Sequence, residues 1–219
     1  MTLPADSTAP AGPAPDRTAV NGLLPWIRAA GPAGAAERPR ARRAAVLFDR
    51  DGTLVHDVPY NGDPAAVRPV TGAADAVAAL RSAGILVGVV SNQSGVARGL
   101  LTRGQVDAVN RRIEALLGPM DVWAVCPHGP EDGCGCRKPA PGLVLAACRV
   151  LAVPPRRAVV IGDIGSDGAA AEAAGAFPVL VPNPATRAEE TAAARTVASD
   201  LAAAVRAALG HLLPAGRPA

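Results

Sequence analysis

The chain has 219 residues, of which 49% are hydrophobic, 19% charged and 2% aromatic, a composition too apolar for a wholly disordered chain. No apolar run approaches the ~20 residues of a membrane-spanning helix, and the amino terminus lacks the basic start and apolar segment of a secretory signal. We therefore expect a cytoplasmic protein with no membrane partner.

The formal charge is +3, but six of 22 basic and three of 19 acidic residues precede Ala44, which leaves 16 of each after that point. A neutral body without a basic stripe argues against binding to nucleic acid.

Residues 1–43 carry seven prolines among alanine, glycine and arginine. This composition is typical of a flexible leader, although an overextended start site would look the same. Residues 21–30 are expected to form at most one short helical turn, without a core. The folded domain is predicted to span residues 44–215, with residues 216–219 as a tail.

From Ala44 onward, short apolar runs alternate with helical patterns. The predicted strands are Ala45–Phe48, Ile85–Val90, Val122–Val125, Ala158–Ile161 and Pro178–Val181. The predicted helices are Gly72–Arg81, one that begins with a capping box at Thr102–Gln105, Leu143–Leu151, Gly165–Ala174 and Asp200–Leu212. Short continuous apolar strands that alternate with helices predict an α/β fold with a doubly wound, Rossmann-like parallel sheet.

Polar residues follow four of these strands. They are Asp49–Thr53, Ser91–Gly95, Cys126–His128 and Gly162–Asp163. Ligands of doubly wound sheets bind beyond the carboxyl ends of the strands. We therefore expect the functional site at this edge of the sheet.

Asp49 and Asp51 are two residues apart, so both carboxylates can face one pocket. Their repulsion would be relieved by Mg²⁺, which prefers one or two carboxylates, waters and phosphate oxygens. Asp163 can supply a third anionic oxygen, and Asp167 is a possible helper behind the ligands. An isolated aspartate at a strand end is more often a helix cap or turn residue. The two aspartate motifs together favour a metal site.

Lys138 is the only lysine in the chain, and the other 21 basic residues are arginines. A compact ammonium suits a point contact between a carboxylate and a phosphoryl oxygen, which favours a catalytic role over chance placement. Ser91–Gly95 offers a hydroxyl and successive backbone N–H groups of the kind that cradle phosphate. As a small polar turn the same segment would be unremarkable.

Two short pairs of soft ligands are close in sequence: Cys126 with His128, and Cys134 with Cys136. These four residues suit a closed tetrahedral zinc site, which would order the loop and take no part in catalysis. A disulfide is the alternative, but it would leave a third cysteine unpaired and is disfavoured in the cytosol. Cys148 lies in a helical pattern and is expected to be a buried small hydrophobic residue.

Four segments, Phe48–Leu54, Ser91–Gly95, Arg137–Pro139 and Gly162–Asp167, together resemble the four motifs of the haloacid dehalogenase (HAD) superfamily of phosphatases. The Cys-x-His and Cys-x-Cys insert resembles that of the D-glycero-D-manno-heptose 1,7-bisphosphate 7-phosphatases and the related histidinol phosphatases. The resemblance covers about residues 45–176. It implies a HAD-type fold without a large cap domain and with a small zinc-binding loop.

The resemblance also implies the roles of the catalytic residues. Asp49 would be the nucleophile that forms an aspartyl-phosphate, and Asp51 the general acid and then the general base. Ser91 and Lys138 would stabilise the transferring phosphoryl group. Mg²⁺ would be held by Asp49, the main-chain carbonyl of Asp51, and Asp163.

The resemblance further implies the substrate contacts, which we assign to Asp57, Tyr60, Asn92, Gln93, Ser94 and Arg137. Arg137 would recognise the rest of the substrate, such as a second phosphate. Val55, Pro59 and Ile164 depart from the family pattern at positions that concern substrate choice. The leading hypothesis is a Mg²⁺-dependent phosphatase that removes the 7-phosphate of a heptose bisphosphate and works as a monomer. The alternatives are a histidinol-phosphate phosphatase, or a zinc-ordered binding module without catalysis.

Overall fold

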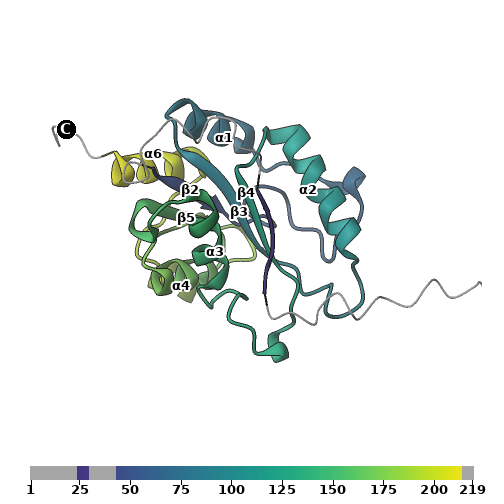
Figure 1. The fold of residues 1–219 in the computed structure, drawn as a ribbon. Coiled ribbons are helices and arrows are strands. Elements are labelled where there is room, and N and C mark those ends of the chain that lie inside the picture. The colour runs from purple at the N-terminus through teal and green to yellow at the C-terminus, as the bar shows by residue number, and fades with distance from the viewer. Residues whose placement is uncertain (1–23, 30–42, 214–219) are drawn as a thin grey trace, which may run out of the picture.

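A six-stranded sheet forms the centre of the fold, with strand order β1-β4-β3-β2-β5-β6 (Figure 1). The computed structural model describes residues 24–29 and 43–213. Its strands are β1 Trp26–Ala29, β2 Ala45–Phe48, β3 Leu86–Asn92, β4 Val122–Cys126, β5 Ala158–Gly162 and β6 Phe177–Leu180. Strands β2 to β6 run parallel to their neighbours, whereas β1 pairs with β4 antiparallel. The predicted parallel sheet is confirmed, and an antiparallel edge strand makes it a mixed sheet.

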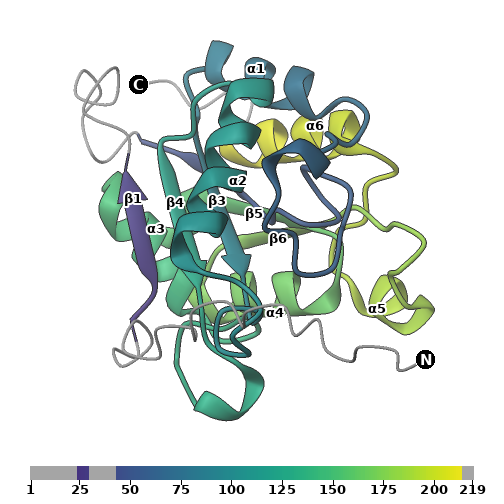
Figure 2. The same cartoon turned by 90° about the vertical axis from the view of Figure 1, so that its right-hand side faces the viewer.

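Helices cover both faces of the sheet, and the two layers can be followed in Figure 1 and Figure 2. The α-helices are α1 Ala73–Ser82, α2 Arg103–Leu117, α3 Gly142–Leu151, α4 Gly165–Ala174, α5 Ala188–Ala193 and α6 Leu201–Leu212. Helices α1, α2 and α6 pack on one face, and α3 and α4 on the other. Short 3₁₀ helices at Pro64–Ala66, Pro130–Asp132 and Pro155–Arg157 lie in the connections. The doubly wound α/β architecture is therefore confirmed, and no large cap domain is evident in the part of the chain that the structure describes.

Strand β2 illustrates why the sheet has a core on each side. Val46 and Phe48 belong to the core beneath α1, α2 and α6, whereas Ala45 and Leu47 belong to the core beneath α3 and α4. Successive side chains of a strand point to opposite faces, so a strand covered on both faces requires an unbroken apolar run. The run ends at Asp49, where the chain leaves the covered part of the sheet.

Strand β1 corrects the expectation for residues 21–30, which predicted at most a helical turn. Trp26–Ala29 instead pairs with Val122–Val125 of β4. Ile27 packs against the core beneath α3 and α4. The guanidinium of Arg28 lies 5.6 Å from the ring centroid of Trp123. It also forms an ion pair of 2.9 Å with the carboxylate of Glu114. Part of the predicted leader therefore belongs to the domain, because β4 offers it an open edge.

The described residues include no helix long and apolar enough to cross a bilayer. The rest of the predicted leader, residues 1–23 and 30–42, lies outside the described residues, as does the predicted tail at 216–219.

Candidate active site

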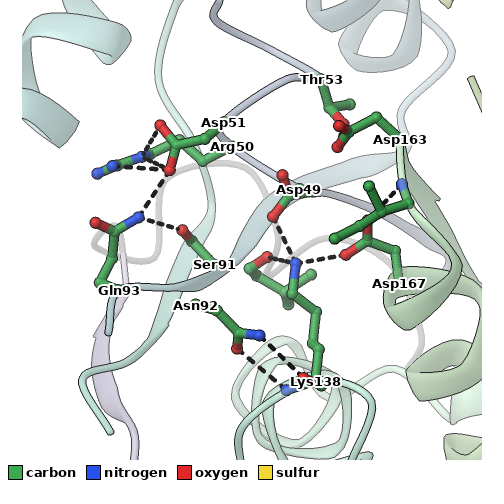
Figure 3. Close-up of polar contacts among 12 residues, drawn as sticks. Asp49, Arg50, Asp51, Thr53, Ser91, Asn92, Gln93, Lys138, Asp163 and Asp167 are labelled. Atoms are coloured by element: carbon green, nitrogen blue, oxygen red, sulfur yellow. Dashed lines mark hydrogen bonds and ion pairs between the residues drawn. The ribbon is translucent and has the colours of Figure 1, made fainter. Parts of the chain in front are cut away.

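The carboxyl ends of β2, β3 and β5 meet beside a pocket of about 380 Å³. The predicted site residues that line it are Asp49, Asp51, Asp57, Tyr60, Asn92, Gln93, Ser94, Lys138 and Asp163. Sequence segments separated by more than 100 residues therefore converge where the strand-end pattern places the site. Figure 3 shows the polar contacts among the residues at its floor.

Lys138 is buried beneath this pocket and uses all three of its ammonium hydrogens. Its Nζ donates to Asp49 Oδ1 at 2.5 Å, to Asp167 Oδ1 at 2.6 Å and to the Val90 carbonyl at 2.9 Å (Figure 3). Burial by itself would lower the pKa of Lys138, but the carboxylates of Asp167 and Asp49 outweigh it and raise that pKa above its ordinary value. Lys138 is therefore a fixed positive charge beside Asp49.

Asp49, Asp163 and Asp167 form a buried carboxylate cluster, with one oxygen from each within 4.8 Å of the others. Burial raises the pKa of Asp49 well above its ordinary value, and Asp167 and Asp163 add to this although Lys138 opposes it. Burial and the charge of Asp167 raise the pKa of Asp163 to about 6. Three carboxylates against one ammonium leave excess negative charge, and hard carboxylate oxygens are the donors that Mg²⁺ prefers. The cluster therefore fits a divalent cation.

Gly52 allows the Asp163 carboxylate to approach the loop after β2. A Cβ at this glycine would lie 2.3 Å from Asp163 Oδ2, and its φ of +86° is in the left-handed region. The other carboxylate oxygen, Oδ1, accepts a hydrogen bond of 3.0 Å from the Thr53 hydroxyl. Asp163 is thus tied directly to the segment that follows Asp49.

Asp51 points away from Asp49 and toward a buried polar network (Figure 3). The Nε of Arg50 lies 3.0 and 2.9 Å from its two carboxylate oxygens, and Gln93 Nε2 donates to Oδ2 at 2.8 Å. Arg50 is itself 1% exposed and donates to Asn110 Oδ1 of α2 at 3.1 Å. These contacts fix the orientation of the Asp51 carboxylate at the pocket wall.

The polar turn after β3 serves two purposes. Ser91 is buried, and its hydroxyl accepts a hydrogen bond of 2.9 Å from Gln93 Nε2. Asn92 lines the pocket, but its side-chain amide is hydrogen-bonded to the backbone of Lys138. Its Nδ2 donates to the Lys138 carbonyl at 3.0 Å, and its Oδ1 accepts from the Lys138 N–H at 3.1 Å. Asn92 therefore positions the segment that carries Lys138.

Asp57 and Tyr60 are exposed and line the pocket together with Ser94 and Gly95. Tyr60 has a positive φ of 52°, and a Cβ at Gly95 would lie 2.8 Å from its Cδ1 atom, so the ring packs directly on the backbone there. Partial burial and the nearby Asp51 raise the pKa of Asp57. Both predicted residues of the substrate loop therefore reach the pocket.

Arg137 lies apart from the other predicted substrate residues. It borders a neighbouring hollow of about 270 Å³ between the 127–137 loop and Ala140, and Lys138 borders both spaces. Its Nη1 donates to the His128 carbonyl at 3.3 Å. The guanidinium is thereby held beside the cysteine loop, and Arg137 is not among the residues that line the pocket at Asp49.

Cys126, His128, Cys134 and Cys136 form a second cluster. His128 Nδ1 lies 3.4 Å from the sulfur of Cys126 and 3.3 Å from that of Cys136, and the sulfurs are 3.3 to 3.7 Å apart. Ligands of a tetrahedral zinc ion are about 3.4–3.8 Å apart. The hydrogen bond between Cys126 and Cys136 lowers the pKa of Cys126 to about 5 and raises that of Cys136, so one of the two thiols is readily ionised. A bound metal requires thiolates. All four cysteines of the chain are free thiols, and Cys148 is buried as predicted, so the disulfide alternative is not supported.

Several residues of the site were not predicted. Asp167 was expected only behind the ligands, yet it forms a direct ion pair with Lys138. Arg50 lies within the predicted Asp49–Thr53 segment but was given no role there. The others, with no strand-end motif of their own to signal them, are Asn110, Asn183 and Thr186. The carboxylate four residues after Asp163 was the one available signal for Asp167. Asn110 and Asn183 are placed by tertiary contacts alone.

Comparison with known proteins identifies this arrangement. Residues 135–205 match the HAD-hydrolase-like family. D-glycero-beta-D-manno-heptose-1,7-bisphosphate 7-phosphatase from Pseudomonas putida is 38% identical over 141 residues, which are 62% of this chain and 81% of the relative. The protein of that name from Escherichia coli K12 is 34% identical over 141 residues, which cover 59% and 74% of the two chains.

Two solved structures have the same fold. The D,D-heptose 1,7-bisphosphate phosphatase of B. bronchiseptica, complexed with magnesium and phosphate, is 32% identical with a TM-score of 0.68 over 76% of this chain and 98% of its own. A putative HAD-like phosphatase from Mesorhizobium loti is 30% identical with a TM-score of 0.73 over 94% and 99%. The cluster of Asp49, Lys138 and Asp163 and these relatives lead to one conclusion: the chain is a phosphatase of the HAD superfamily and belongs to the heptose-bisphosphate phosphatase family.

Proposed function

We propose that this phosphatase removes the 7-phosphate of D-glycero-D-manno-heptose 1,7-bisphosphate. The observation that carries the proposal is the buried triad of Asp49, Lys138 and Asp163 beneath a pocket whose wall includes Asp57 and Tyr60. Relatives at 34–38% identity that bear this activity in their names support the choice of substrate. We expect the second phosphate of the substrate to lie toward Arg137, whose guanidinium borders the neighbouring hollow.

In the first step, an oxygen of Asp49 attacks phosphorus while the bond from phosphorus to the sugar oxygen breaks. Asp51 gives its proton to the departing sugar oxygen, so the product leaves as an alcohol. The ammonium of Lys138, 2.5 Å from Asp49, and the hydroxyl of Ser91 stabilise the negative charge of the transferring group. The products of this step are the heptose monophosphate and an aspartyl-phosphate at Asp49.

In the second step, water attacks phosphorus and the bond to Asp49 breaks, which releases inorganic phosphate. Asp51, now ionised, accepts the proton of that water. Arg50 and Gln93 hold the Asp51 carboxylate away from Asp49 in this structure (Figure 3), so it must turn toward the reacting group for both transfers. Ser94 lines the pocket, where its hydroxyl would contact a phosphate oxygen. Gln93 acts through Asp51 and Ser91, to which its amide donates, and Asn92 keeps Lys138 in place.

Two metal sites complete the proposal. Asp49, the Asp51 carbonyl and Asp163 would hold Mg²⁺, which when bound neutralises charge on the phosphoryl oxygens. The four-residue cysteine and histidine cluster would hold a structural zinc ion. Reduced thiols at such a cluster suit a reducing compartment, which favours the cytoplasm.

The test is phosphate release from purified protein with Mg²⁺, comparing both anomers of the heptose bisphosphate with histidinol phosphate. We expect release from a heptose bisphosphate and its loss in Asp49→Asn, which keeps the size of the side chain but removes the nucleophile. Release from histidinol phosphate alone would retain the mechanism and reject the heptose substrate. Full activity in Asp49→Asn would reject Asp49 as the nucleophile.

A further inference from the structure

The carboxylate of Asp163 is held from a third loop, in addition to the loops that follow β2 and β5. The third loop follows β6 and runs beside the end of β5. There the Val181 N–H donates to the Gly162 carbonyl at 2.8 Å. Two side chains of this next turn, Asn183 and Thr186, reach back to Asp163. They come from a segment that carries no motif of the resemblance.

Asn183 joins the two loops that carry the metal-binding carboxylates. Its Nδ2 donates to Asp163 Oδ2 at 2.8 Å and to the Gly52 carbonyl at 3.1 Å. Its Oδ1 accepts from the Ala185 N–H at 2.8 Å. Because the Ala185 N–H can only donate, its partner must be the oxygen of the Asn183 amide, and the nitrogen must therefore face Asp163. Both hydrogens of that nitrogen then have an acceptor, one in Asp163 and one in Gly52. The side chain is half-buried, so these contacts are partly shielded from water.

Thr186 completes the contact through its hydroxyl. Its Oγ1 donates to the main-chain carbonyl of Asp163 at 2.6 Å and accepts from the Asn183 N–H at 2.8 Å. Thr53 donates to the other carboxylate oxygen of Asp163 from the opposite side. Both carboxylate oxygens and the carbonyl of Asp163 therefore have a donor with a fixed place in the fold.

We propose that Asn183 and Thr186 are positioning residues that hold Asp163 in the orientation required to bind Mg²⁺. This rests on the proposed function, in which Asp163 is a metal ligand. Each carboxylate oxygen keeps a lone pair free beside its hydrogen bond, so the donors orient the ligand without blocking it. Partners that orient a metal ligand in this way typically change metal affinity or activity by roughly 10–100-fold when removed.

The test compares four variants in full-length protein dialysed against magnesium-free buffer without chelators, so that the cysteine cluster keeps its metal. Asn183→Ala removes the side-chain amide. Thr186→Val removes the hydroxyl at nearly constant size, and Thr186→Ser keeps the hydroxyl. Thr191→Ala is the matched control, because the Thr191 hydroxyl bonds only within α5, to the Arg187 carbonyl at 3.4 Å. Two quantities are measured: the Mg²⁺ concentration that gives half-maximal phosphate release, and the rise in melting temperature on addition of MgCl₂.

We expect Asn183→Ala and Thr186→Val to need at least roughly tenfold more Mg²⁺ for half-maximal phosphate release and for the same rise in melting temperature. The KM for the ester should be unchanged. Thr186→Ser and Thr191→Ala should behave like the parent. A lower melting temperature with the parent's Mg²⁺ dependence would show that the turn is only structural and would overturn the proposal. If Asn183→Ala does not fold, Thr186→Val decides. If the parent releases no phosphate from any ester, the proposed function fails, and the Mg²⁺-dependent melting shift still tests the positioning role.

Discussion

Lys138 and Asp167 form an ion pair with 2.6 Å between Nζ and Oδ1, in which the side chains are 3% and 2% exposed. Asp49 shares the same ammonium from the other side. A buried charge is tolerated only where it is paired and hydrogen-bonded, so each of these residues depends on the others. Asp49, the proposed nucleophile, is therefore held by the interior of the protein as well as by its own loop.

Replacement of this lysine tests that dependence. Lys138→Met keeps the length of the side chain but leaves two buried carboxylates without a partner. We expect the free energy of unfolding of the Mg²⁺-free protein to fall by about 3–5 kcal/mol. Urea denaturation measures it. The control is Asp107→Ala, which breaks an exposed ion pair of 3.8 Å with Arg103 and should cost about 0.5 kcal/mol or less. Equal losses in the two variants would contradict the expectation.

A pair of glycine variants separates backbone strain from damage to the proposed Mg²⁺ site. Gly52 and Gly72 have φ values of +86° and +81°, but a Cβ at Gly72 would meet nothing within 4 Å, whereas at Gly52 it would meet Asp163 Oδ2 at 2.3 Å. Both alanine variants should lose about 1–2 kcal/mol from the left-handed backbone. Only Gly52→Ala should lose phosphate release as well, because the added methyl group displaces the Asp163 carboxylate. Similar activity in the two variants would show that Asp163 can move without consequence.

The stability of the Mg²⁺-free protein should depend on pH through Asp163. Its pKa is raised from 3.8 to about 6, so between these values the folded chain keeps a proton that the unfolded chain releases. Stability from this group is therefore highest below pH 3.8 and declines by about 3 kcal/mol as pH rises to 6. Mg²⁺ requires the ionised carboxylate, so stabilisation by MgCl₂ should grow over the same range.

Urea denaturation at pH 5 and pH 7.5, with and without MgCl₂, measures both effects. Because other groups titrate too, the informative quantity is the difference between the parent and Asp163→Asn, which cannot ionise. The free energy of unfolding should decline less with rising pH in Asp163→Asn than in the parent. Its increase on addition of MgCl₂ should be lost in Asp163→Asn. An unchanged response to MgCl₂ would exclude Asp163 as a ligand.

The cysteine cluster should bind one zinc ion per chain. Cys134→Ala should lose it, whereas Cys148→Ala should retain it, because Cys148 lies in the core beneath α3. Metal content of the purified variants measures this. Cys136 is two residues before Lys138, so loss of zinc should lower kcat by loosening the loop that positions the ammonium. A full zinc content in Cys134→Ala would rule out the assignment of that ligand.

Much of this protein follows from its sequence alone. The unbroken apolar runs identified five strands, because the covered length of a strand buried on both faces is almost wholly apolar. Asp49 and Asp163 could be predicted because chemistry at the end of a parallel sheet depends on residues directly after the strands. Lys138 could be predicted because it is the only lysine in the chain. The four residues of the cysteine cluster could be predicted together because one short stretch of sequence carries them.

The tertiary structure decided what depends on contacts between distant segments. Strand β1 has only four residues, and it forms because β4 has an open edge for it. Asp167 was placed on Lys138, Arg50 on Asn110 and Asn183 on Asp163 by the way distant segments pack at the sheet edge. A hydrogen bond between residues far apart in the chain leaves no local pattern, because each partner only has to reach the other once the fold has brought their segments together.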